Sequence, residues 1–364
     1  MRSLLPAFAL WLAGAWVSLR WGIAGDLVSP EIVAQIRLPR LVQGTAVGAG
    51  LSVAGVILQA LFSNPLCEPY TLGISSGAAL GAVLGGALGW SLSWSGLAGS
   101  AFLGAFVFSI LLYLLSLRFK NQSQGLLLSG VMLGFLGSSL VALLMAVSDS
   151  AGVQGALYWL LGDLTRSRVE GSWVSLALIV FLSAAAWWQR HSLDAFLLGE
   201  EGALSVGVDV VRARKRLLLL SCLMVAICVS GAGMVGFIGL MVPHAVRRFS
   251  GALHVRLVPG SFLWGAGTMI WADVFARNLA PPFELPVGVI TALVGAHFSS
   301  WWFLVAGGPF HDLCPCIVAE IRRKRDLERC DLPAGAGVGG GAFGSERCGK
   351  IELAQISRGP SHFA

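Results

Sequence analysis

Ten long apolar runs limit what this chain can fold into. Crossing the hydrocarbon core of a bilayer takes a helix of about 20 apolar residues. Only 12% of the 364 residues are charged, whereas soluble proteins carry about 25%. The sequence therefore predicts an all-α, polytopic membrane protein with about ten transmembrane helices in a compact bundle. The runs lie near residues 4–24, 41–62, 72–90, 97–117, 126–147, 172–189, 217–235, 237–249, 259–279 and 286–305, and Pro243 interrupts the short eighth run.

The composition changes after the last run. Residues 1–305 are predicted to form the transmembrane domain, and residues 306–364, which are rich in Gly, Arg and Cys, a divergent and disordered tail. An appended regulatory tail and an altered reading frame would both give this composition. The tail segment GSERCGK, residues 344–350, has the spacing of a phosphate-binding loop. Ile351 replaces the Ser or Thr that would hold magnesium and no apolar strand precedes it, so the match is read as chance.

Basic residues in the short connections predict the orientation in the membrane. With ten spans both ends of the chain lie on one side, and eleven Lys and Arg residues fall on that side against six on the other. Basic residues collect in cytoplasmic connections. Both termini, and the connection between the sixth and seventh runs, are therefore predicted to be cytoplasmic. The first run resembles a secretory signal, but nine further spans favour a retained helix.

Glycines are regularly spaced in the third run. They recur at every fourth residue from Gly73 to Gly89, which places them along one face of a helix. In lipid, a stripe of this kind lets two helix backbones approach closely. We therefore expect this helix to pack tightly inside the bundle.

A few charged residues interrupt the apolar pattern. Asp273 and Arg277 lie four residues apart in the ninth run, so they are predicted to pair on one helix face. Glu68 and Glu284 each have prolines close by, which predicts that they lie in turns rather than in lipid.

A short polar segment, LLGEEGALSVGV at residues 197–208, separates the sixth and seventh runs. Gly199 and Gly202 flank the pair Glu200 and Glu201, and Gly207 follows. Glycines permit sharp turns, and the carboxylates could complement a basic surface on a partner. On these residues alone, an ordinary solvated loop is the favoured interpretation.

Motifs for covalent chemistry are missing from the sequence. HExxH does not occur, and the six histidines do not group. The CPC at residues 314–316, with two distant cysteines, fits a zinc site poorly. The basic residues form no stripe with interleaved aromatics, which argues against a nucleic-acid partner. We therefore expect no catalytic residue, no metal and no cofactor.

Four segments together resemble the permeases of type II bacterial ABC importers, which take up iron–siderophores, haem and cobalamin. The segments are residues 35–82, beginning QIRLPR; LLGEEGALSVGV, 197–208; GMVGFIGLMVPHAVRR, 233–248; and residues 271–298, beginning WADVFAR. The resemblance covers about residues 30–305. It implies ten spans in the bacterial inner membrane, with both termini cytoplasmic. It also implies three kinds of protein partner: a second permease subunit, in a homodimer, a pair of cytoplasmic ATPases and an extracytoplasmic binding protein.

The resemblance also assigns roles to individual residues. It implies that Gly199, Glu200, Glu201, Gly202 and Gly207 belong to a coupling loop that seats in a groove of the ATPase. Among the residues on the outer face, it implies that Arg37 and Arg277 pair with acidic residues of the binding protein; snorkelling at the membrane interface is the alternative. It further implies that Ser123 and Gln124, in the connection between the fourth and fifth runs, belong to the cytoplasmic gate, with a plain polar loop as the alternative.

The resulting expectation is a permease subunit of an ATP-driven importer of a metal chelate. The alternative is an ion-coupled secondary transporter, which needs buried titratable groups near the membrane midplane. Asp273 is the candidate for such a group, and Arg277 follows it by four residues. A membrane enzyme is disfavoured because no acid–base cluster is visible.

Overall fold

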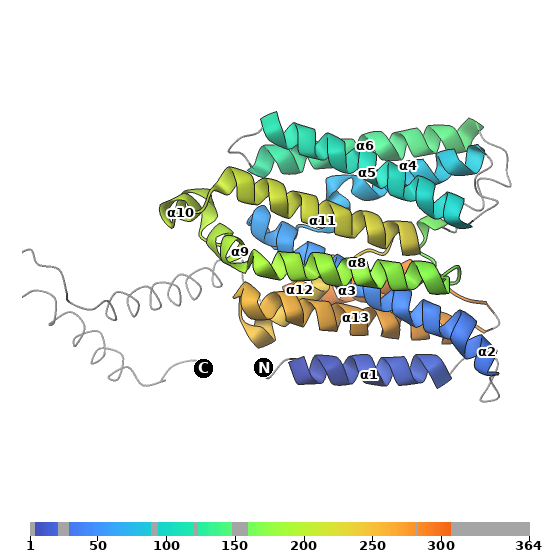
Figure 1. The fold of residues 1–364 in the computed structure, drawn as a ribbon. Helices are drawn as coiled ribbons and strands as arrows, with labels where there is room; N and C mark the ends of the chain where they lie inside the picture. Colours follow the sequence, from blue (N-terminus) through green and yellow to red (C-terminus); the bar gives the residue numbers. More distant parts are fainter. Residues whose placement is uncertain are drawn as a thin grey trace, which may run out of the picture. The chain divides into compact units, whose positions relative to one another are not determined.

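The computed structural model describes residues 4–20, 29–88, 94–118, 123–147, 159–281 and 283–306. The regular structure in these ranges is helical, which confirms the predicted all-α fold (Figure 1). Each of the ten apolar runs coincides with one long helix. These helices are α1 (Leu4–Arg20), α3 (Leu38–Leu61), α4 (Ile74–Ala87), α5 (Trp94–Arg118), α6 (Ser123–Val147), α8 (Val169–Trp188), α11 (Val210–Ala232), α12 (Ile238–Ser250), α13 (His254–Asn278) and α14 (Val287–Ala306).

Short helices complete the described part of the chain. They are α2 (Pro30–Ile32), the π-helical turn η1 (Val33–Arg37), the 3-10 turn η2 (Pro69–Leu72), α9 (Arg190–Phe196) and α10 (Gly199–Ser205). The predicted tail lies outside the described residues except for Ala306, the last residue of α14.

Several of these helices could cross a membrane. Within the described ranges, five helical stretches have the length and apolar composition that a span needs: Pro30–Leu61, Gly96–Leu115, Gly125–Val147, Val169–Trp188 and Val210–Ala232. Helices α1 and α4 and the Val287–His297 part of α14 are apolar but shorter. The remaining long helices, α12 and α13, carry charged residues that lower their hydropathy.

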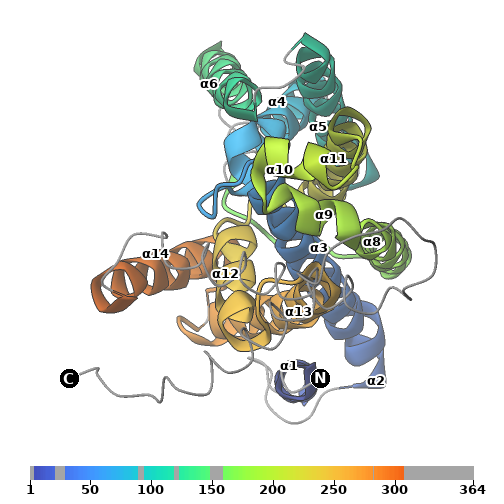
Figure 2. The same cartoon turned by 90° about the vertical axis from the view of Figure 1, so that its left-hand side faces the viewer.

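Helix α3 is the centre of the bundle. Every residue from Pro39 to Leu61 is buried, and α3 packs against α8, α11, α12 and α13. In Figure 2, α3 passes between a group formed by α4, α5 and α6 and a group formed by α12, α13 and α14. An apolar helix covered on all sides by other helices cannot face lipid, so α3 serves as the internal support of the domain.

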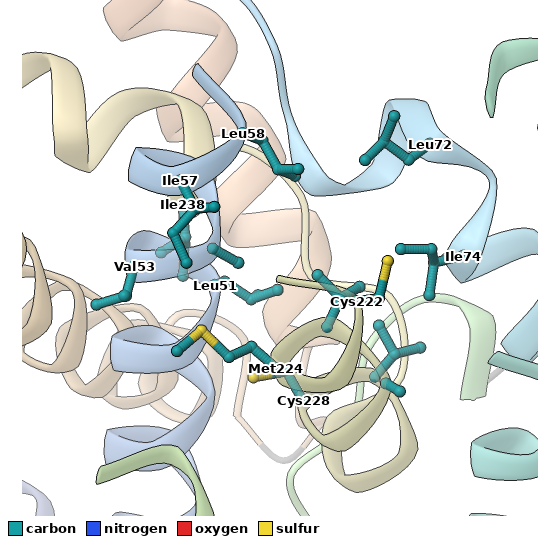
Figure 3. Close-up of a cluster of buried hydrophobic side chains, with 14 of the residues drawn as sticks. Leu51, Val53, Ile57, Leu58, Leu72, Ile74, Cys222, Met224, Cys228 and Ile238 are labelled. Carbon is teal, nitrogen blue, oxygen red and sulfur yellow. The ribbon is translucent and has the colours of Figure 1, made fainter. Parts of the chain in front are cut away.

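The core around α3 is made of aliphatic and sulfur-containing side chains. Figure 3 shows Leu51 and Leu58 of α3 near Ile74 of α4 and Cys222 and Met224 of α11. The three cysteines of the described residues are free and buried. They fill space as small apolar side chains.

The predicted glycine stripe packs on a neighbouring helix, as expected. A Cβ atom added at Gly77 or Gly81 of α4 would overlap α5, at the Gly104 carbonyl or the Ser100 carbonyl, respectively. Because these positions carry no side chain, the backbones of α4 and α5 lie in direct contact. Gly73 differs from the stripe: it has a φ of 75° and precedes α4 instead of lying within it.

Candidate functional site

Two groups of polar residues lie near opposite ends of α13. The first is the α9–α10 segment, residues 190–207, which contacts the start of α13. The second, the arginine cluster, consists of Arg37, Arg40, Asp273, Arg277 and Glu284, with Arg277 next to the last residue of α13. In Figure 1 the α9–α10 segment and α2, which precedes the cluster in sequence, lie at opposite ends of the bundle.

The α9–α10 segment contains two left-handed glycines, one on each side of the α10 turn. Gly199 has a φ of 78° and separates α9 from α10, and Gly207 has a φ of 83° between α10 and α11. A side chain would strain both positions, since residues with a Cβ atom rarely adopt this conformation. The predicted sharp turns are confirmed at these two residues. Gly202 instead lies inside α10, beside the Leu198 side chain.

The two neighbouring glutamates have different surroundings. Glu200 forms an ion pair with Arg214 of α11, whose side chain is buried. This pair fixes the first turn of α10 to α11. Glu201 is exposed. The two carboxylates cannot be distinguished from the sequence. In the structure Glu200 pairs with Arg214 within the chain, whereas Glu201 lies on the surface.

The arginine cluster is a buried network of charges. Arg40 Nε lies 2.8 Å from Asp273 Oδ1, and Arg40 Nη1 lies 2.8 Å from Glu284 Oε2. The second Asp273 oxygen, Oδ2, lies 3.2 Å from Arg277 Nε, which confirms the predicted pairing on α13. Glu284 lies in the connection before α14, outside the helices, as predicted.

Arg40 is a member of this network that sequence reasoning missed. The spacing in the sequence could have indicated it, because Arg40 follows Arg37 by three residues and therefore lies on the same helix face. The two arginines look alike in sequence. Only the placement of α3 against α13 shows that Arg40 is the residue that meets the carboxylates.

Arg37 and Arg277 both donate to the C-terminal turn of α1. Arg37 Nη1 donates to the Leu19 carbonyl at 2.7 Å, and Arg277 Nη2 donates to Ser18 Oγ at 2.8 Å. The last carbonyl groups of a helix lack partners within the helix, and cations near them are favourable. Each arginine is 6% exposed. In this conformation they stabilise α1.

A proline explains the local shape around Arg37. Pro39, the second residue of α3, has no N–H, so it cannot donate the usual helical hydrogen bond to the carbonyl four residues earlier. The turn before it, Val33–Arg37, is a wider π-helix. The wider turn brings Arg37 to the end of α1.

Glu68 holds the start of α12. Its Oε1 accepts a hydrogen bond from the backbone N–H of Phe237, which has a φ of 68° and precedes α12. Glu68 lies in the turn before η2, as predicted. Burial raises the pKa of this carboxyl group, and the Phe237 N–H opposes the shift. The contact joins two of the segments on which the family resemblance rests.

Ser123 and Gln124 begin α6. Their side chains, and residues 119–122 before them, lie outside the described residues. Their role in a gate therefore stays a prediction.

Several known proteins are similar to this chain in sequence, and a solved structure is similar to it in fold. The hemin transport system permease protein HmuU of Yersinia pestis is 37% identical over 289 residues, covering 78% of this chain and 86% of that protein. The cobalamin import system permease protein BtuC of Halobacterium salinarum is 39% identical over 295 residues, covering 81% and 78%. A solved inward-facing structure of a metal-chelate type ABC transporter has a TM-score of 0.77 at 32% identity and covers 84% of this chain and 99% of that chain.

A family model matches almost all of the predicted transmembrane domain. The model of the FecCD transport family matches residues 7–304, a range that includes both the α9–α10 segment and the arginine cluster. This chain therefore belongs to the FecCD transport family.

Proposed function

We propose that this chain is the membrane-spanning permease subunit of an ATP-driven importer of a metal chelate such as an iron–siderophore, haem or cobalamin. The chain forms no covalent bond with its cargo. Two copies pair in the bacterial inner membrane, with both termini cytoplasmic. A cytoplasmic ATPase pair drives the change between two conformations, and an extracytoplasmic binding protein delivers the cargo. Similarity to the hemin and cobalamin permeases supports this substrate class.

The α9–α10 segment is the observation that carries the proposal. It is polar, lies outside the long apolar helices and has two left-handed glycine turns. The Glu200–Arg214 ion pair fixes it to α11, while Glu201 stays exposed. A segment that is firmly attached to the bundle and exposes an acidic side chain can transmit the movement of a docked ATPase. We assign docking contact to Glu201 and positioning of the segment to Glu200.

Charge reversal at Glu201 tests the coupling role. With the ATPase subunit co-expressed, we expect Glu201→Lys to reduce the amount of ATPase that co-purifies by at least severalfold, because docking depends on charge complementarity. The control is Glu170→Lys. Glu170 is also exposed and lies in the first turn of α8, at the end remote from α9. Undiminished co-purification with Glu201→Lys, together with normal uptake, would contradict the role.

The proposed docking role of Arg37 and Arg277 requires a local exchange of partners. Both side chains are buried against α1. Carboxylates of a binding protein must therefore replace the Leu19 carbonyl and the Ser18 hydroxyl. A carboxylate accepts stronger hydrogen bonds from arginine than either neutral group, so the exchange is favourable once the binding protein excludes water.

An ion-coupled carrier fits the charges less well. Asp273 is the candidate proton site for such a carrier, but its two oxygens lie in ion pairs with Arg40 and Arg277. The structure therefore favours a structural role for Asp273.

A further inference from the structure

Asp194 of α9 and His254, the first residue of α13, form a contact that the proposed function leaves unused. Asp194 Oδ1 lies 2.9 Å from the His254 backbone nitrogen and 2.7 Å from its Nδ1. The His254 side chain is fully buried, at 0% exposed. One carboxylate oxygen thus receives two hydrogen bonds from a single residue of another helix.

This contact supplies a cap that α13 lacks. The first backbone N–H groups of a helix have no partner within it. Leu253, at the N-cap position of α13, offers no side-chain acceptor. Asp194 accepts in its place and puts a negative charge at the positive end of the helix. Since a carboxylate can only accept, Nδ1 of His254 must carry the donated proton.

Helix α13 connects this contact to the arginine cluster. His254 and Arg277 are 23 residues apart on α13, which contains Pro259 in its second turn and stays helical through it, and the separation is about 35 Å at 1.5 Å per residue. The helix is packed directly on α3, where a Cβ atom added at Gly48 would overlap the Gly265 carbonyl. A closely packed helix of this length can move as one element.

We propose that Asp194 and His254 are positioning residues that fasten the α9–α10 segment to α13. A displacement of the segment by the ATPase would thereby reach Arg277 and the arginine cluster. The inference rests on the proposed function and adds the connection between its two partner sites. It predicts that nucleotide bound to the ATPase changes the affinity of the binding protein through this contact.

The α9–α10 segment has other attachments, so loss of this contact need not unfold it. Leu193 and Phe196 of α9 are buried in the core. Ser63 Oγ donates to the Phe196 carbonyl at 3.4 Å, and Glu200 pairs with Arg214. Variants of Asp194 or His254 are therefore expected to assemble with the ATPase.

The test uses the reconstituted complex of permease, ATPase and binding protein. The affinity of the ligand-free binding protein is measured with and without a non-hydrolysable ATP analogue, and the ratio of the two dissociation constants reports the coupling. His254→Asn keeps an amide N–H near the position of Nδ1, whereas His254→Gln places it near Nε2. Asp194→Asn keeps an acceptor oxygen, whereas Asp194→Ala removes it.

We expect a ratio near the wild-type value for His254→Asn and Asp194→Asn. For His254→Gln and Asp194→Ala we expect a ratio near one, with undiminished ATPase co-purification. The matched control is Asp209→Ala, which removes the carboxylate cap of α11 and should keep the wild-type ratio. A wild-type ratio in both His254→Gln and Asp194→Ala would overturn the inference, and so would equal loss in His254→Asn and His254→Gln. A wild-type complex without any nucleotide effect would instead contradict the proposed function.

Discussion

At the scale of single residues, Arg40 and Arg277 of the arginine cluster are paired with the carboxylates of Asp273 and Glu284. Arg40 is held between Asp273, which is buried, and Glu284, whose side chain is 37% exposed. A buried ion needs its partner, because removal of that partner leaves an uncompensated charge in a low-dielectric interior. An exposed partner contributes little, because water screens the pair.

This difference gives a prediction for two substitutions around the same arginine. Asp273→Asn should lower the free energy of unfolding by about 3–5 kcal/mol, as for other broken buried pairs. Glu284→Gln should lower it by less than about 1 kcal/mol. Thermal unfolding of the purified permease in one detergent measures both. Equal effects of the two substitutions would show that burial does not decide the strength of these pairs.

Contacts within one helix could be predicted from the sequence, but contacts between distant residues could not. The Asp273–Arg277 pair was predictable because both residues lie on one helix, four positions apart. The part played by Arg40 was not, because its acidic partners lie 233 and 244 residues away in the sequence. Glu200 and Glu201 were likewise indistinguishable until the position of Arg214 was known.

At the scale of helices, close contact between backbones determines which glycines matter. In α4, a Cβ atom at Gly81 would overlap the Ser100 carbonyl of α5, whereas a Cβ atom at Gly86 would meet no atom within 4 Å. Gly81→Ala should therefore separate the two helices and destabilise the protein by about 1–3 kcal/mol. Gly86→Ala is the control on the same helix and should be neutral or slightly stabilising. The melting temperatures of the two variants decide the point, and a stable Gly81→Ala protein would contradict the close packing.

The end of α1 gives a second prediction at this scale. Ser18 Oγ accepts from Arg277, so Ser18→Ala frees a donor that the binding protein is proposed to use. Hydrogen bonds to charged groups contribute about 1.5–3 kcal/mol, so the affinity for the binding protein should rise by about tenfold or more. The control, Ser129→Ala, removes a hydroxyl that bonds only within α6 and should leave the affinity unchanged. Surface plasmon resonance with immobilised complex measures both, and unchanged or weaker binding by Ser18→Ala would argue against competition by α1.

The positions of the long helices were predictable from hydropathy. The helix boundaries that depend on turns were harder to predict. All ten apolar runs are helical. The hydrocarbon core of a bilayer contains no water to pair with backbone N–H and C=O groups, so a spanning segment must satisfy them within a helix. The third run extends over 72–90 by hydropathy, but α4 begins only at Ile74 because Gly73 has a positive φ. The two short helices of the α9–α10 segment, residues 190–207, were not predicted from composition. Their boundaries depend on Gly199 and Gly207 and on contacts with α11 and α13.

At the scale of the whole molecule, the proposed permease is a passive element driven by a partner. The arginine cluster, α13 and the α9–α10 segment form one continuous path through the described part of the chain. The groups along that path are suited to docking and to transmitting movement. In the proposed function the energy comes from the ATPase, through differential affinity for two conformations of the permease.

Uptake by reconstituted vesicles tests this claim most directly. The permease is inserted alone, or with the ATPase, the binding protein and ATP, and accumulation of hemin and of cobalamin is measured with and without a proton gradient. We expect accumulation against a concentration gradient only in the complete complex with ATP, regardless of the proton gradient. Accumulation by the permease alone, driven by the proton gradient, would contradict it.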